Sequence, residues 1–547
     1  MKKLSYILLV PIVLFIGSCD ILEENIVADV TSDTHFTTPT GFESGVNAAY
    51  ERLRYFYGDE QGCNLTEYGT DLVTNAGHGG FHYMNQYTAG LNSEASPFSN
   101  VWNNYYLGIN ACNAVIGRAA EVQGMEESQV NSRVAEARFL RALYYFTLVQ
   151  FFGPVHLTLE ETTGVETEAN RTPEPEVYEE IVKDLEFAVA NLPASQEDYG
   201  RATKPAAEML LSQVLLTRGY TDFAEADDFS RAATLAETVI DDYNFELLDD
   251  FEMIFDNDNE MNAEVIWSVQ YEKDPLINGP GNRSHLYYRS WYETYSEGLV
   301  RSLEPGYGRP WIRFKPTQFT YENFRPLDQD SRYKKSFQDT WYYNDEATLP
   351  TDQYPGISVG DTAIYIDPDM TAAEVEANQD NTPYNLISWA TIPINMFPSL
   401  KKHDDFQRPD VNAEAGNKDY IVYRLAEAYL FAAEAHFMDG NEPAAVEHLN
   451  EVRERAAWDG QEAALTATTA ALLASDGIDF ILDERAREFY GEQKRWLTLK
   501  RTGKLLERVR AHNDLGGPNI QEHHLLRPIP ATQINRSTNE YPQNDGY

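Results

Sequence analysis

The sequence predicts an all-α dominated fold, built from helical hairpins and interrupted by one large, irregular, loop-rich insertion. Two observations predict the hairpins: apolar residues recur at spacings of three and four in two separate blocks, and small residues line the faces where paired helices must approach. A third observation predicts the insertion, because residues 278–418 largely lose this periodicity and become rich in Pro, Gly, Asn and Tyr. A chain of 547 residues is long enough to combine a repeat scaffold with such an insertion.

The N-terminus has the pattern of a bacterial lipoprotein leader. Lys2 and Lys3 precede an eleven-residue apolar run at residues 6–16, which is shorter than the roughly 18–20 residues of a membrane-spanning helix. Two small residues then lead to Cys19, which we expect to become the acylated, palmitate-bearing first residue of the mature chain. The alternative is a secreted protein in which Cys19 is incidental. The next residues resemble a signal for export to the outer face of the outer membrane: Asp20, Glu23 and Glu24.

The first helical block begins at Arg133 with a strongly apolar stretch, which Gly153 and Pro154 should end. Three more amphipathic helices are predicted at residues 177–192, 205–219 and 229–240, and the last two should form a hairpin. Residues 263–271 are rich in β-branched and aromatic side chains, so we expect a short strand there.

A second hairpin is predicted at residues 420–438 and 442–457. Hairpins that repeat at about 34 residues indicate a tetratricopeptide-like scaffold, although any alanine-rich pair of helices would show similar spacing. The predicted organisation is therefore a signal peptide (1–18), a lipid-anchored N-terminus (19–45), two scaffold parts (46–277 and 419–547) and a ligand-binding insertion (278–418).

The formal charge of −44 argues against nucleic acid as a ligand, since the chain repels polyanions. Besides Cys19, only Cys63 and Cys112 are present, so one disulfide at most can form within the chain, and no Cys/His zinc spacing exists. We expect no cofactor. Calcium remains an option at three alternating carboxylates that lack the glycine of an EF-hand: Asp256, Asp258 and Glu260.

Glu484, Glu488 and Glu492 recur every four residues, which could indicate acid/base or metal-assisted catalysis. We favour a structural ion-pair network, because three carboxylates on one stripe would repel unless they were neutralised. The expected partners are the interleaved arginines together with Arg138 and Arg141. No catalytic residue is therefore assigned, and we expect a protein that is not an enzyme.

Aromatic residues gather in the insertion, where residues 281–343 contain three of the eight tryptophans of the chain. Aromatic rings suit pyranose sugars, whose C–H faces stack while their hydroxyl groups form hydrogen bonds at the rim. We expect about half of these rings only to pin the loop to the scaffold. The candidate ligand-binding residues here are Trp291, Tyr292, Tyr295, Trp311, Trp341 and Tyr342.

Two further features bear on the ligand. The same region holds ten basic and seven acidic residues, which weakly favours a neutral-to-acidic polysaccharide. A second candidate loop at residues 67–87 is flexible at Gly77, Gly79 and Gly80 and carries Phe81 and Tyr83. Trp102 follows nearby, in a helical context where core packing is at least as well supported as stacking on a sugar.

Three segments besides the leader resemble the SusD/RagB family of nutrient-uptake outer-membrane lipoproteins: EARFLRALYYFTLVQFFGPVHL (residues 136–157), ILDERAREFYGEQKRWLTLKRTGKL (481–505) and LLRPIPATQINRSTNEYPQNDGY (525–547). This resemblance implies a tetratricopeptide-like fold, the capture of poly- or oligosaccharides and a SusC-like TonB-dependent transporter as partner. It also implies that an early acidic residue lines the sugar site, which points to Asp71. The alternatives are a glycoside hydrolase or lyase on a helical scaffold, or a protein-binding tetratricopeptide scaffold.

Overall fold

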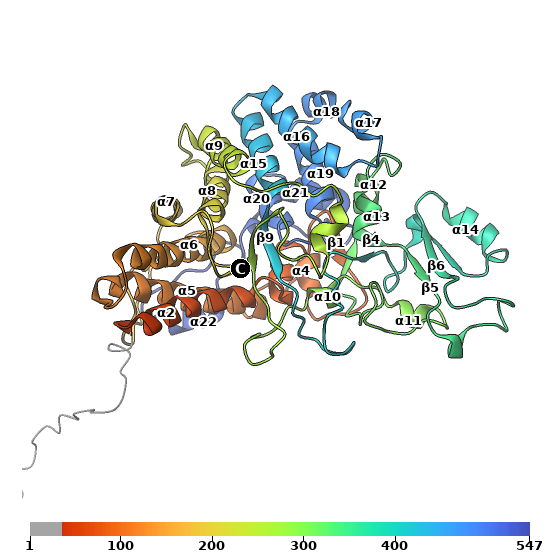
Figure 1. Ribbon diagram of the computed structural model, residues 1–547, viewed down its shortest axis with the longest axis horizontal. Coiled ribbons are helices and arrows are strands. Elements are labelled where there is room, and N and C mark those ends of the chain that lie inside the picture. Colours follow the sequence, from red (N-terminus) through yellow and green to blue (C-terminus); the bar gives the residue numbers. More distant parts are fainter. Residues whose placement is uncertain (1–35) are drawn as a thin grey trace, which may run out of the picture.

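The computed structural model describes residues 36–547, and the predicted leader and Cys19 lie outside these residues (Figure 1). The first scaffold block consists of helices that follow one another along the chain: α2 (Pro39–Glu51), α3 (Glu60–Thr66), α4 (His82–Gln86), α5 (Ser96–Arg118), α6 (Glu127–Phe152), α7 (Glu174–Asn191), α8 (Lys204–Arg218) and α9 (Asp228–Asp241). The four helices predicted from periodicity in this block are confirmed as α6 to α9. Gly153 ends α6 with a positive φ of 69°, as the sequence predicts.

The second block contains the remaining scaffold helices, long and short: α15 (Leu425–Met438), α16 (Glu442–Ala456), α17 (Glu462–Thr466), α18 (Thr469–Asp476), α19 (Ile478–Phe489), α20 (Arg495–Arg501), α21 (Leu505–His512) and α22 (Ala531–Arg536). Consecutive helices from α5 to α9 pack side by side, and α9 packs directly against α15 (Figure 1). The whole insertion separates α9 from α15 in the sequence, yet it leaves the helical stacking continuous. The all-α dominated prediction is confirmed.

One predicted helix boundary is wrong. Residues 420–424 form strand β9 (Tyr420–Arg424) rather than the first turns of α15. This strand pairs antiparallel with β2 (Val265–Val269), the strand that the sequence does predict. Tyr420, Ile421, Val422 and Tyr423 are β-branched or aromatic, so a strand partner outweighs their helical spacing.

The insertion is rich in loops, as predicted, and holds only short elements. Its helices are α10 (Ser284–Tyr287), α11 (Tyr292–Tyr295), α12 (Gln318–Asn323), α13 (Arg332–Ser336) and α14 (Ala372–Gln379). A three-stranded sheet consists of β5 (Thr340–Tyr342), β6 (Thr362–Asp367) and β7 (Asn385–Ser388), and β4 (Phe337–Gln338) pairs with β8 (Ser399–Leu400). Figure 1 shows β5, β6 and α14 projecting from the side of the molecule opposite α2 and α6.

Both cysteines of the described part are buried free thiols, so Cys63 and Cys112 do not form the one disulfide that the sequence allows. Within residues 36–547, no helix combines the length and the apolar character that are needed to cross a bilayer.

Candidate functional site

The two aromatic loops singled out in the sequence lie side by side. Strand β1 (Val73–Asn75) lies within the loop at residues 67–87 and pairs antiparallel with β3 (Phe314–Pro316) of the insertion. The pairing continues beyond the strands, because the amide of Ala76 donates to the carbonyl oxygen of Arg313 (3.2 Å) and that of His78 donates to Ile312 (3.1 Å). This ladder joins residues that are far apart in the sequence at one surface.

A cluster of partly exposed rings forms at this junction. His78 lies edge-on to Trp291, with ring centroids 5.1 Å apart and planes at 75°. The Trp291 indole nitrogen donates to Glu293 (3.1 Å), and its backbone amide donates to the carbonyl oxygen of Asn395 (2.8 Å). Trp291 is half-buried, so the ring is held in place while part of it faces solvent. We call His78, Trp291, Trp311 and Arg313 the aromatic cluster.

Trp311 and Arg313 form the other half of the aromatic cluster. The Arg313 guanidinium lies 5.0 Å from the centre of the Trp311 ring, and its Nε lies 2.8 Å from Oε1 of Glu60. Such a cation–π contact orients both side chains. Trp311 is half-buried, like Trp291.

The backbone between these two residues is strained. Ile312 has a φ of +54°, which is an outlier for a β-branched residue and costs about 1–3 kcal/mol. The surroundings hold it, because its oxygen accepts from His78 and its side chain packs with Ala76 and Phe397. A Cβ at Gly77 would lie 1.5 Å from Oδ1 of Asn395, so any larger residue there would displace the Asn395 side chain.

A groove of about 860 Å³ lies along the β1–β3 ladder, lined there by Thr74, Asn75, Lys315 and Pro316 and not by the residues of the aromatic cluster. This volume lies within the range of about 300–1,000 Å³ that is typical of ligand pockets. Lys315 lines it and donates to the carbonyl oxygen of Ile392 (3.0 Å), and burial lowers the pKa of this lysine. Other lining residues come from the insertion and from the end of α21: Phe319, Trp389, Ile394, His512 and Leu515.

Six of the ten predicted ligand-binding residues are at least partly accessible. Tyr295 and Tyr342 are the most exposed, at 39% and 48%, and lie on α11 and β5. Phe81 and Tyr83 are half-buried and lie in the loop at residues 67–87, with ring centroids 6.2 Å apart. Trp291 and Trp311 complete the six.

The other four predicted residues are buried, so the structure does not present them to a ligand. Trp341 and Tyr292 are fully buried and stack on each other at 6.4 Å and 13°, so they pin the insertion. Trp102 is 2% exposed and its indole nitrogen donates to Gln533 (3.2 Å). It is a core residue of α5, as the alternative interpretation held.

Asp71, the fourth, is fully buried under two arginines. Its carboxylate accepts two hydrogen bonds from Arg495 (2.8 and 2.7 Å) and one from Arg508 (2.7 Å). Burial by itself would raise the pKa of Asp71, but the two guanidinium groups outweigh it and hold the pKa well below its usual range. The residue ties β1 to α20 and α21 and offers no free oxygen to a sugar.

The excess of basic residues in the insertion does not produce a free cationic surface. Eight of the ten basic side chains form ion pairs, among them Arg301 with Glu293, Arg309 with Glu414 and Lys334 with Asp339. The acidic end of the predicted neutral-to-acidic range of polysaccharides therefore has little support from charge.

The recurring glutamates are fully or almost fully buried and form the predicted ion-pair network. Burial would raise the pKa of Glu488 and Glu492, but neighbouring cations outweigh it and lower both pKa values to about 2. Glu492 lies just beyond the end of α19 rather than on the same helix. The cations around the three carboxylates are Arg332, Lys402, Arg424, Arg453, Arg455 and Arg487.

Four of the five predicted partners of this network are wrong. Of the interleaved arginines only Arg487 pairs with it, whereas Arg485 pairs with Glu427 and Arg495 with Asp71. Arg138 and Arg141 pair instead with Asp184 of α7, at 3.2 and 2.7 Å. Most of the actual partners come from the insertion and from β9 and α16, which no local pattern could connect to α19. Asp256, Asp258 and Glu260, the three carboxylates considered for calcium, each accept a hydrogen bond from a different donor. Calcium binding at these residues stays a prediction.

Sequence reasoning missed several residues of this site. His78 and Arg313 stand inside the two highlighted regions, but only the β1–β3 pairing shows that they adjoin the tryptophans. Asn395 and Phe397 contact the aromatic cluster, but the sequence around them has no motif that indicates a site, apart from the nearby Trp389.

Comparison with known proteins identifies the family. The SusD family model matches residues 263–547, and a second model, described as starch-binding and associating with the outer membrane, matches residues 28–216. The chain is 26% identical to SusD-like protein P2 of Formosa agariphila over 100% of both chains. It is also 26% identical to the starch-binding protein SusD of Bacteroides thetaiotaomicron, over 78% of this chain and 75% of that one.

Solved structures show the same fold. Surface glycan-binding protein A of Bacteroides thetaiotaomicron, in complex with laminarihexaose, aligns with a TM-score of 0.69 at 20% identity and covers 93% of this chain and 100% of its own. The family model covers more than half of the sequence, and the helical stacking agrees with it. The chain belongs to the SusD family.

Proposed function

We propose that the protein is a cell-surface lipoprotein that captures a poly- or oligosaccharide and delivers it to a SusC-like TonB-dependent transporter in the outer membrane. One observation carries the binding part of this proposal: Trp291 and Trp311 are partly exposed at one end of the β1–β3 ladder, and a groove of about 860 Å³ runs along that ladder. The name of the SusD relative, a starch-binding protein, supports a glycan as the ligand.

The geometry suits an extended sugar chain better than a small, enclosed ligand. One or two pyranose rings can stack on the aromatic cluster, while the following rings continue along the groove past Lys315 and Trp389. Most cations of the insertion are already paired, so a neutral glycan fits this surface better than a uronate or a sulfated polymer.

Binding without bond cleavage fits the carboxylates near the aromatic cluster. A glycosidase needs two carboxyl groups free to act as acid and as base or nucleophile. Glu60 is paired with Arg313, and Glu293 is paired with Arg301, so both are committed to holding the rings. The names of the relatives likewise describe binding proteins.

Trp291→Ala should weaken glycan binding about tenfold or more, because a stacked tryptophan is a typical hot spot of an interface. Isothermal titration of the mature protein against a panel that includes laminarihexaose and malto-oligosaccharides measures the change. Trp291→Phe, which keeps a ring, should retain part of the affinity.

Trp458→Ala is the matched control, since Trp458 is half-buried at the scaffold and forms a hydrogen bond to Leu327 away from the aromatic cluster. It should bind glycan as the parent does. Equal affinity of Trp291→Ala and the parent for every bound glycan would place the site elsewhere. Sugar cleavage products in the titration mixture would favour a glycoside hydrolase or lyase. Binding of a protein or peptide, without binding of any glycan, would favour the protein-binding scaffold.

The lipid anchor leads to a second prediction. Cys19→Ala should abolish incorporation of labelled palmitate and move the protein from the membrane fraction to the soluble fraction, because acyl chains contribute about 0.8 kcal/mol per buried methylene. Cys112→Ala, which changes a buried thiol of α5, is the control and should leave both readouts unchanged. Label that persists in Cys19→Ala would show that the anchor is not this cysteine.

The transporter part of the proposal has its own test. The lipidated protein, extracted from native membranes in mild detergent, should co-purify with a TonB-dependent barrel. Glycan binding without any associated barrel would leave capture in place and contradict delivery to such a transporter.

A further inference from the structure

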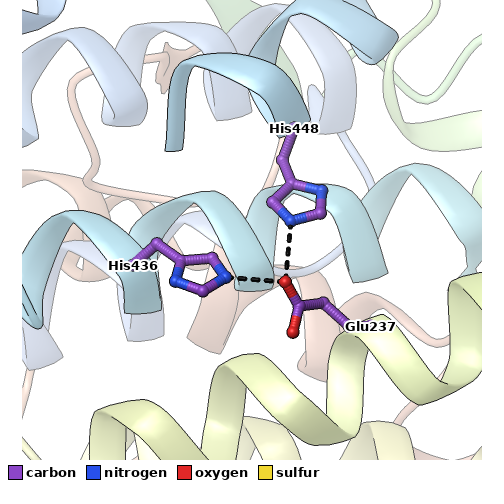
Figure 2. A group of neighbouring side chains, drawn as sticks. All are labelled: Glu237, His436 and His448. Carbon is purple, nitrogen blue, oxygen red and sulfur yellow. Dashed lines mark hydrogen bonds and ion pairs between the residues drawn. The ribbon is translucent and has the colours of Figure 1, made fainter. Parts of the chain in front are cut away.

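Three side chains that the glycan site does not use meet between three scaffold helices. Glu237 comes from α9, His436 from α15 and His448 from α16 (Figure 2). Nε2 of His436 lies 2.7 Å from Oε1 of Glu237, and Nε2 of His448 lies 3.2 Å from the same oxygen. The ligand atoms all lie within 4.8 Å of one another, and it is the only such group of three His, Cys, Asp or Glu side chains within residues 36–547.

The two imidazole rings are nearly parallel, with centroids 5.6 Å apart and planes at 6°. Figure 2 shows both rings directing a nitrogen at the carboxylate that rises from α9. The side chains of His436 and His448 are about 15% exposed and that of Glu237 is 36% exposed. The group is therefore organised by packing but remains open to ions from solvent.

We propose that Glu237, His436 and His448 bind a divalent transition-metal ion of the zinc type, which links α9 to the α15–α16 hairpin. Two imidazole nitrogens and one carboxylate oxygen are a ligand set that suits zinc, and three protein ligands leave a fourth position for water. Magnesium and calcium prefer oxygen ligands, so this set disfavours them.

The distances fit with little movement. Bonds of about 2.0–2.2 Å in tetrahedral geometry place neighbouring ligand atoms about 3.3 Å apart. The separations of 2.7 and 3.2 Å between the carboxylate oxygen and the two nitrogens must therefore open by about 0.6 and 0.1 Å. The two nitrogens already lie within 4.8 Å of each other. Without metal, hydrogen bonds between the imidazoles and the carboxylate keep the three side chains converged.

The position of the group gives the metal a structural role. Glu237 belongs to the scaffold block before the insertion, whereas His436 and His448 belong to the block after it. A metal there would fasten the two blocks at the point where α9 packs against α15. The strongly negative chain also raises the local concentration of divalent cations.

Zinc chloride titrated into the chelator-treated mature protein, prepared without a polyhistidine tag, should bind with one ion per chain and raise the melting temperature. X-ray absorption should report two nitrogen ligands and one carboxylate oxygen at about 2.0–2.2 Å. His436→Gln and His448→Gln should each weaken zinc binding by about 100-fold or more, since each removes a direct ligand.

Glu447→Gln is the matched control, because Glu447 precedes His448, is exposed and carries the same charge as Glu237. It should bind zinc as the parent does, and far-UV circular dichroism should show all variants folded. Absence of zinc binding in the parent would overturn the proposal. So would equal zinc affinity in the double variant of both histidines, or displacement of the bound zinc by an equal concentration of calcium.

Discussion

Arg424→Met should lower the free energy of unfolding by about 3–5 kcal/mol, because it removes one member of a buried ion-pair network and leaves charged carboxylates without a partner. Arg424 is fully buried in β9 and bonds to Glu264 (2.9 Å), Glu488 (2.5 Å) and Glu492 (3.0 Å). Methionine has a similar length but no charge, so the loss reflects the electrostatics more than the packing.

Urea unfolding followed by far-UV circular dichroism measures this change, with Arg231→Met as the control. Arg231 pairs with Glu186 at the surface, where the two side chains are 34% and 54% exposed, so its removal should cost less than about 1 kcal/mol. Equal losses in the two variants would mean that the buried network contributes no more than a surface pair.

The same network predicts how stability depends on pH. The pKa values of Glu488 and Glu492 are about 2 in the folded protein, below the value of about 4.3 in an unfolded chain. A lowered folded-state pKa stabilises the protein fully above the unfolded value, and the stabilisation is lost as the pH falls from about 4 through about 2. In Arg424→Met the pKa of Glu492 should rise, so the midpoint of acid unfolding should move to higher pH. An unchanged midpoint would contradict the pairing.

The scaffold could be predicted from the sequence because its signal is local. The helices α6, α8 and α9 each carry their apolar stripe within one segment, and Gly153 marks an end by its own backbone preference. Strand β9 could not be predicted, since its partner β2 is remote in the sequence and competes with helical spacing that continues into α15.

The site could be predicted only in outline. Aromatic residues in loops rich in glycine identified the two segments that meet, but which rings face solvent depends on tertiary packing. Trp291 and Trp341 have similar local sequences, each followed by a tyrosine, yet the first is half-buried and the second is fully buried. Asp71 shows the same limit, because the arginines that bury it lie more than 400 residues further along the chain.

Trp341→Ala should lower the free energy of unfolding by about 3–5 kcal/mol, since the loss of a buried tryptophan leaves a large cavity. Trp341 is fully buried in β5 and stacks on Tyr292. Its indole nitrogen has no hydrogen-bond partner among the described residues, so Trp341→Phe should lose only volume and cost clearly less. Thermal and urea unfolding, followed by circular dichroism, give both values.

A comparison of Trp341→Ala with Trp291→Ala separates the packing of the insertion from its recognition of glycan. Trp291 is half-buried, so Trp291→Ala should cost little stability but most of the glycan affinity, whereas folded Trp341→Ala should cost stability and leave the affinity within a factor of about two. The opposite pattern would mean that Trp341 reaches the ligand after a rearrangement of β5. A loss of affinity in both variants at temperatures where both are folded would mean that the insertion binds glycan as one coupled unit rather than through the aromatic cluster.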